Sequence, residues 1–124
     1  MSRPRVLAYG QQAAWVTERL AHAGFPVVRH TPEVVLCHGG DGTLLRAERS
    51  FPGVPKVPVR VGSGARLCPR HELDAVLAGL ARGDLAEERL ALLELRVGRA
   101  RFLALNDVPL RNENPALAVR FHLE

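Results

Sequence analysis

The stretch HGGDGTLL at residues 38–45 directly follows the short apolar run at residues 34–37 and decides the fold that we expect for this chain. Gly39, Gly40 and Gly42 allow a tight turn whose bare N–H groups can face phosphate oxygens, with Asp41 at the mouth of the turn. A strand, a glycine turn and a helix in this order hold nucleotide phosphates in open α/β sheets. Because Gly-Gly and Asp-Gly pairs are also common in ordinary turns, a plain strand-to-helix turn is the alternative interpretation.

Hydrophobic spacing on both sides of this turn alternates between strand and helix. The expected strands are residues 5–9, 25–29, 34–38 and 57–61, and the expected helices are residues 13–23, 43–49 and 72–82. Gly24 with Pro26, and Gly83, supply the helix stops. This alternation predicts a three-layer αβα sandwich with a parallel Rossmann-like sheet of four strands and the glycine turn at the carboxyl ends of the strands.

After Gly83 the period of the apolar residues changes to two. Residues 90–97 and 101–110 are expected to pair as antiparallel strands around a turn at Gly98, and a third alternation runs from Ala116 until the sequence ends in mid-pattern. We therefore predict a nucleotide-binding α/β domain over residues 1–89 and the first strands of an incomplete antiparallel β domain over residues 90–124. Leu117, Val119, Phe121 and Leu123 lie on one face of the last strand, so a homo-oligomer is expected.

Composition narrows the classes of protein further. The 124 residues carry a formal charge of +4, and every basic residue except Lys56 is an arginine. The arginines form no run, so no nucleic-acid surface is expected, although a positive field suits anionic nucleotides. No apolar run is long enough to cross a membrane, and a cytoplasmic protein is expected. Cys37 and Cys68 suit buried thiols, and the dispersed histidines predict no metal site.

Four segments together resemble NAD kinases, in the same order and at similar spacing. They are GGDGTLLRA at 39–47, the helical segment 72–89, the strand 90–97 and FLALNDVPL at 102–110. The resemblance covers nearly the whole chain and implies phosphorylation of the 2′-hydroxyl of the adenosine ribose of NAD, with ATP as donor and Mg²⁺ as cofactor. It also implies an α/β domain followed by a β-rich domain that completes the substrate site.

The resemblance implies a role for each matching residue. Asp41 would be the general base, and Gly39, Gly40, Gly42 and the Thr43 hydroxyl would form the phosphate cradle. Asn106 and Asp107 would bind ribose hydroxyls, although the family usually has Asn-Glu there and Asp107 is one methylene shorter. Gly62 and Gly64 form a second glycine turn where the family has Asn-x-Gly-x-Leu-Gly-Phe, and Arg60 and Arg66 beside it are candidates for phosphate contacts.

Two other functions stay open on the sequence. The family's later Gly-Asp-Gly turn and Gly-Ser-Thr-Ala segment are absent. The first alternative is therefore a nucleotide-binding, regulatory or degenerate module without kinase activity, and an NAD kinase would be inactive in this short form. Diacylglycerol-type lipid kinases also carry GGDGT. Against that alternative, LLRAERSF at 44–51 and the LND motif resemble NAD kinases.

Overall fold

The structure is a computed structural model that describes residues 2–61, 72–105, 107–109, 111, 113–114, 116–118, 120 and 122. The chain divides into two compact units, Met1–Ala86 and Glu87–Glu124. Within the described residues, each unit has a β-sheet of its own.

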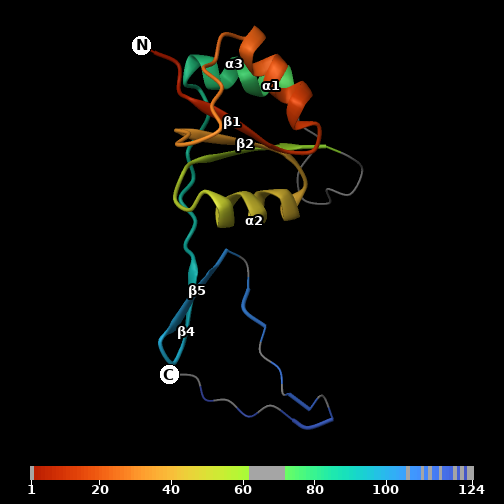
Figure 1. Ribbon diagram of the computed structural model, residues 1–124, viewed down its shortest axis with the longest axis vertical. Helices are drawn as coiled ribbons and strands as arrows, with labels where there is room; N and C mark the ends of the chain where they lie inside the picture. Colours follow the sequence, from red (N-terminus) through yellow and green to blue (C-terminus); the bar gives the residue numbers. More distant parts are fainter. Residues whose placement is uncertain are drawn as a thin grey trace. The chain divides into compact units, whose positions relative to one another are not determined.

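The first unit is an α/β sandwich built on a parallel sheet. The strands β1 (Val6–Gly10), β2 (Val34–Gly39) and β3 (Lys56–Arg60) lie in the order β1-β2-β3. The helices are α1 (Ala13–His22), α2 (Asp41–Ser50) and α3 (Leu73–Arg82). Figure 1 shows α1 and α3 on one face of the sheet and α2 on the other. The predicted layered architecture is thus confirmed.

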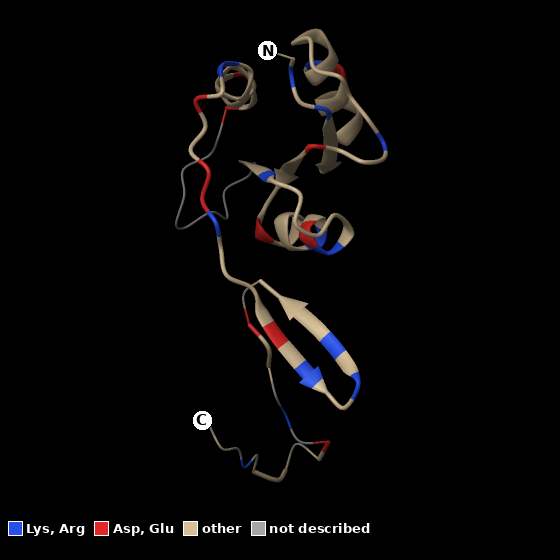
Figure 2. Ribbon diagram, turned by 90° about the vertical axis from the view of Figure 1, so that its left-hand side faces the viewer, with Lys and Arg blue, Asp and Glu red and all other residues tan. Residues whose placement is uncertain are grey.

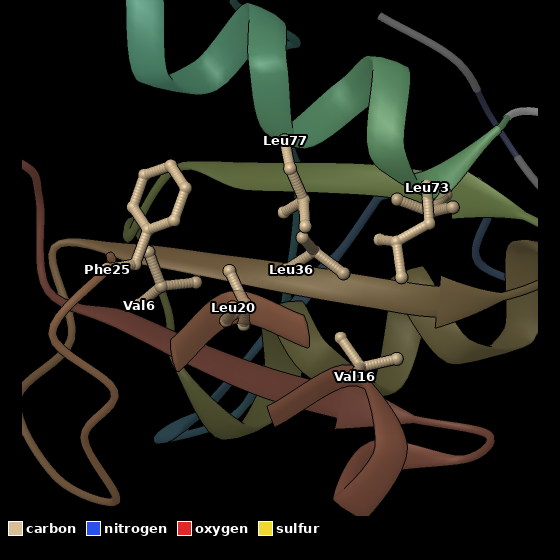
Figure 3. Close-up of a cluster of buried hydrophobic side chains, with 8 residues drawn as sticks. Val6, Val16, Leu20, Phe25, Leu36, Leu73 and Leu77 are labelled. Atoms are coloured by element: carbon tan, nitrogen blue, oxygen red, sulfur yellow. The ribbon is translucent and has the colours of Figure 1, made fainter. Parts of the chain in front are cut away.

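The central strand β2 is buried on both faces, which explains its continuous apolar sequence. On the face toward α1 and α3, Leu36 joins a cluster of buried side chains from both helices and all three strands (Figure 3). Its fully or nearly buried members are Val6, Val16, Leu20, Phe25, Leu36, Val59, Leu73 and Leu77. On the opposite face, Val35 and Cys37 pack against Ala47 of α2. These two cores fix the position of β2 and therefore the point at which the chain leaves the sheet after Gly39.

The sheet has three strands where the sequence predicted four. The segment expected as a strand at residues 25–29 makes only a single bridge, between Val27 and Val6. Pro26 has no N–H to donate, and the chain turns away at Thr31, whose φ is 47°. In β3, by contrast, Pro58 is tolerated because β3 is at the edge of the described sheet.

The second unit contains an antiparallel hairpin, as predicted, formed by β4 (Leu93–Val97) and β5 (Ala100–Ala104). Leu93, Leu95 and Val97 share one face with their partners on β5, and charged residues occur along both strands (Figure 2). The strand β5 ends at Ala104, short of the predicted end at residue 110. Residues 116–118, 120 and 122 are not in a strand, and the rest of the last predicted strand lies outside the described residues.

Candidate functional site

The carboxyl ends of the three parallel strands meet at one edge of the sheet. In register, Gly10 of β1 lies beside His38 of β2, and Gly39 of β2 lies beside Arg60 of β3. The glycine turn leaves the sheet at this edge and enters α2, so it lies where open α/β sheets bind ligands. The predicted position of the turn is therefore confirmed.

Two glycines at this edge are required by close packing around Thr43. Gly10 has φ +108°, and a Cβ there would lie 2.4 Å from the His38 carbonyl oxygen and 2.5 Å from Thr43 Cγ2. Gly39 has φ +155°, and a Cβ there would lie 2.3 Å from Thr43 Oγ1. Thr43 itself is buried between them, with 3% of its surface exposed. These three residues lock the start of α2 onto the ends of β1 and β2.

The next two glycines of the motif have a different environment. Gly40 and Gly42 are exposed, and a Cβ at Gly40 would meet no atom within 4 Å. Gly40 has φ −106°, which any residue can adopt, so neither packing nor backbone strain within the chain requires a glycine here. The open space at Gly40 is room in which a ligand can approach the backbone closely.

The backbone around Gly40 suits an anion. Gly40 precedes the first residue of α2. It has no side chain that could accept hydrogen bonds from the free N–H groups of the first turn. The Thr43 N–H is bonded to the Gly40 carbonyl at 3.1 Å. The N–H groups that precede it belong to the turn itself and have no partner inside the helix. They lie at the positive end of the helix dipole.

Asp41 is the first residue of α2, and it does not cap that helix. The capping position is Gly40, which has no side chain, so Asp41 stands one residue inside the helix, where a carboxylate interacts favourably with the helix dipole. Its side chain is 68% exposed and forms an ion pair with Arg60, whose side chain is 21% exposed. The structure thus brings Arg60, one of the two arginines considered as phosphate ligands, to Asp41. The other, Arg66, lies outside the described residues.

Arg46 and the β1–α1 loop lie at this site, although neither was expected there from the sequence. Arg46 Nη2 donates a hydrogen bond to Thr43 Oγ1 at 3.5 Å, so its guanidinium lies beside the turn. The signal was its spacing of one helical turn from Thr43. In the loop, the Gln11 N–H donates to the His38 carbonyl oxygen at 2.8 Å. No local pattern predicts that contact, because it joins residues 27 positions apart.

The remaining predicted site residues are only partly described. Gly62, Gly64 and Asn106 lie outside the described residues. Asp107 is exposed and follows the end of β5 in the second unit. Their roles stay predictions.

Two titratable side chains lie on the α2 side of the sheet: Cys37 in β2 and Lys56 at the start of β3. Burial raises the pKa of the Cys37 thiol from 9.0 to about 11, and the nearby positive charge of Lys56 acts in the opposite direction. Lys56, with 7% of its side chain exposed, pairs with Glu48 and donates to the Phe51 carbonyl at the end of α2. Cys37 is thus a buried structural thiol, as predicted, and Cys68 lies outside the described residues.

In the described part of the chain, no group of three His, Cys, Asp or Glu side chains is arranged to hold a metal ion. None of the described helices is long and apolar enough to cross a membrane.

Comparison with known proteins gives a consistent set of relatives. The NAD kinase of Gemmatimonas aurantiaca is 34% identical in an alignment of 114 positions that covers 82% of this chain and 39% of that protein. The relatives are NAD kinases. The NAD kinase of Sulfurisphaera tokodaii is 29% identical over 82% of this chain and 41% of its own length. The NAD kinase of Saccharolobus islandicus is 34% identical over 74% of this chain and 37% of its own length.

The chain spans about two fifths of the length of the NAD kinases that it matches. No protein-family model matches it. The similarity therefore extends over only part of each of those NAD kinases.

Proposed function

We propose that this chain is the nucleotide-binding part of an NAD kinase, which transfers a phosphoryl group from ATP to the 2′-hydroxyl of the adenosine ribose of NAD. One observation carries the proposal: the open backbone at Gly40 lies next to the exposed carboxylate of Asp41, at the carboxyl edge of the sheet. The similarity to NAD kinases supports the choice of substrates.

In this proposal, phosphate groups lie against the turn at Gly40 and Gly42. The N–H groups of the first turn of α2 donate to phosphate oxygens, and the guanidinium groups of Arg46 and Arg60 balance their charge. We give Gly39 and Thr43 another role than the phosphate contacts that the resemblance implies. Both are buried against each other, so they hold the turn in shape and leave the ligand contacts to its exposed residues.

Asp41 is the proposed general base. Its carboxylate is exposed and is held at the edge of the sheet by Arg60, so a ribose hydroxyl can reach it. The carboxylate accepts the proton of that hydroxyl while the hydroxyl oxygen bonds to the γ-phosphorus, the bond from the γ-phosphorus to the β-phosphate oxygen breaks, and ADP leaves. Asn106, Asp107, Gly62 and Gly64 keep the substrate-binding roles that the resemblance gives them.

Mg²⁺ fits this site only as a companion of the nucleotide. The described residues offer no three-ligand cluster, whereas Mg²⁺ in kinases is bound by substrate phosphates and one or two carboxylates. The ion would be held mainly by the phosphates of the nucleotide and would neutralise their charge, which leaves the Asp41 carboxylate to act as the base.

A second candidate function is nucleotide binding without turnover. It applies to these 124 residues taken by themselves, which span about two fifths of the length of the related kinases. Phosphoryl transfer depends on positioning both substrates, so residues that supply only one side of a site react slower by several powers of ten than the whole site does. We therefore expect the 124-residue chain to bind adenine nucleotides weakly and to form little NADP.

The test is calorimetric titration of the chain with ATP and with NAD, together with measurement of NADP formation. Gly40→Val should fill the space proposed for the ligand and weaken binding at least about tenfold, while costing at most about 1 kcal/mol of stability at this capping position. Ala21→Val, on an exposed site of α1, is the matched control and should bind as the wild type does. Equal affinity in Gly40→Val, or no binding of either nucleotide to the wild type, would overturn the proposal.

A further inference from the structure

The single tryptophan of the chain lies at the same edge of the sheet as the glycine turn. Trp15 is in the first turn of α1, directly after the loop that leaves β1, and 46% of its surface is exposed. Its ring contacts the ring of His38, with centroids 5.9 Å apart and an angle of 57° between the planes. His38 is followed at once by Gly39 and Gly40, so the indole lies beside the turn.

The loop that carries Trp15 is fixed to the turn by several contacts. His38 is 3% exposed, and its Nδ1 lies 2.8 Å from the Gln11 carbonyl oxygen. Since a carbonyl oxygen only accepts, Nδ1 carries the hydrogen of this bond. The Gln11 N–H returns a bond to the His38 carbonyl at 2.8 Å. The indole is therefore held on a preorganised support.

The exposed side chains of this loop suit a ligand with a flat heteroaromatic ring. The side chains of Gln11 and Gln12 are exposed, and both carry an amide that can donate and accept at once. An indole face for stacking and an amide for paired hydrogen bonds are complementary to adenine.

We propose that Trp15, with Gln11 or Gln12, forms a binding subsite for the adenine ring of a nucleotide whose phosphates lie at the glycine turn. The inference deepens the proposed function and rests on it for the position of the phosphates. His38 is a positioning residue in this arrangement, since it supports the indole from the interior of the protein. The adenine could belong to ATP or to NAD, and the experiment separates these sources.

The experiment uses the intrinsic fluorescence of Trp15, because no other tryptophan contributes to the signal. ATP, NAD and inorganic tripolyphosphate are titrated into the whole chain, and calorimetry measures the same affinities. We expect a nucleotide that stacks on Trp15 to change its emission, whereas tripolyphosphate should bind without such a change. A response to ATP alone assigns the subsite to the phosphate donor, and a response to NAD alone assigns it to the acceptor.

Variants separate stacking from folding. Trp15→Ala should lower the affinity for the nucleotide that changes the fluorescence about tenfold and leave the affinity for tripolyphosphate unchanged. Trp15→Phe should recover most of the lost affinity because it keeps an aromatic face. Phe102→Ala, which removes an exposed aromatic ring from the hairpin of the second unit, is the control and should change neither affinity.

The outcomes distinguish this inference from the proposed function. If ATP or NAD binds the wild type and Trp15→Ala equally, the adenine subsite is wrong and the proposed function stands. If neither nucleotide binds the folded wild type, both are wrong. If Trp15→Phe is as weak as Trp15→Ala while both are folded, stacking is not the interaction, and the inference is overturned.

Discussion

The carboxylate of Asp41, the first residue of α2, forms an ion pair with the guanidinium of Arg60, the last residue of β3. The pair connects the glycine turn to the neighbouring strand at the carboxyl edge of the sheet, where Gly39 and Arg60 lie side by side in register. An ion pair with an exposed carboxylate contributes little to stability. Its main effect is to place a carboxylate and a guanidinium together where the proposed substrates meet.

The first prediction concerns Asp41→Asn. A general base matters more to the transition state than to ground-state binding, so nucleotide affinity should stay within about twofold while any NADP formation falls by at least about a hundredfold. Calorimetry and a sensitive NADP assay measure the two effects. Undiminished NADP formation in the variant would show that Asp41 is not the base.

The second prediction compares glycines of the same edge. Gly10→Ala should cost more than about 2 kcal/mol of unfolding free energy, because the new Cβ would meet the His38 carbonyl and Thr43 and because φ is +108°. Gly40→Ala should change stability by less than about 1 kcal/mol, since its site is open. Urea unfolding followed by circular dichroism provides the comparison, and equal losses would contradict the packing described for this edge.

The third prediction concerns Lys56, which joins β3 to the end of α2. Lys56→Met leaves the partly buried Glu48 carboxylate without its opposite charge, although Glu48 and the Phe51 carbonyl keep hydrogen bonds from the N–H groups of Gly53 and Val54, and we expect a loss of roughly 2 to 3 kcal/mol. Arg82→Met breaks an exposed pair with Asp84 and is the control, with an expected change of less than about 1 kcal/mol. The same urea experiment measures both, and a neutral Lys56→Met would argue against a structural role for the buried pair.

The fourth prediction follows from the pKa of Cys37. Burial raises this pKa from 9.0 to about 11, so in the unfolded chain the thiol ionises at lower pH than in the folded protein. The contribution of Cys37 to stability is therefore complete below pH 9 and is lost between pH 9 and about pH 11. In a Cys68→Ser background, the thiol should react slowly with a disulfide reagent at neutral pH, and replacing Cys37 with Ala should flatten the fall in stability above pH 9.

The fifth prediction concerns the apolar face of the hairpin. Val97 and Phe102 are 61% and 56% exposed and share this face with Leu93 and Leu95. Exposed apolar patches promote association, so the wild type should form oligomers as its concentration rises, and Phe102→Thr should shift it toward monomer. Sedimentation velocity measures the oligomeric state of the wild type and of the variant. A wild type that stays monomeric at high concentration would contradict the expected homo-oligomer.

Local sequence determined much of the first unit. The continuous apolar run at 34–37 requires burial on both faces, and this predicts a central strand, which is β2. The spacing of Leu73 and Leu77 predicts the buried face of α3, and Gly83, with φ 72°, ends that helix as expected. The Gly-Gly-Asp-Gly motif predicts a turn into a helix. Each of these signals depends on neighbours within a few residues.

Tertiary structure decided which glycines pack and which face open space. The sequence alone does not separate Gly39 from Gly40, because their different environments depend on Thr43, Gly10 and the end of β1. It also does not pair Asp41 with Arg60 or Trp15 with His38, since these residues are far apart in the chain. The parallel register of β1, β2 and β3 brings them together. The motif therefore specified the turn from β2 into α2, whereas the long-range packing of the strands determined which side chains surround it.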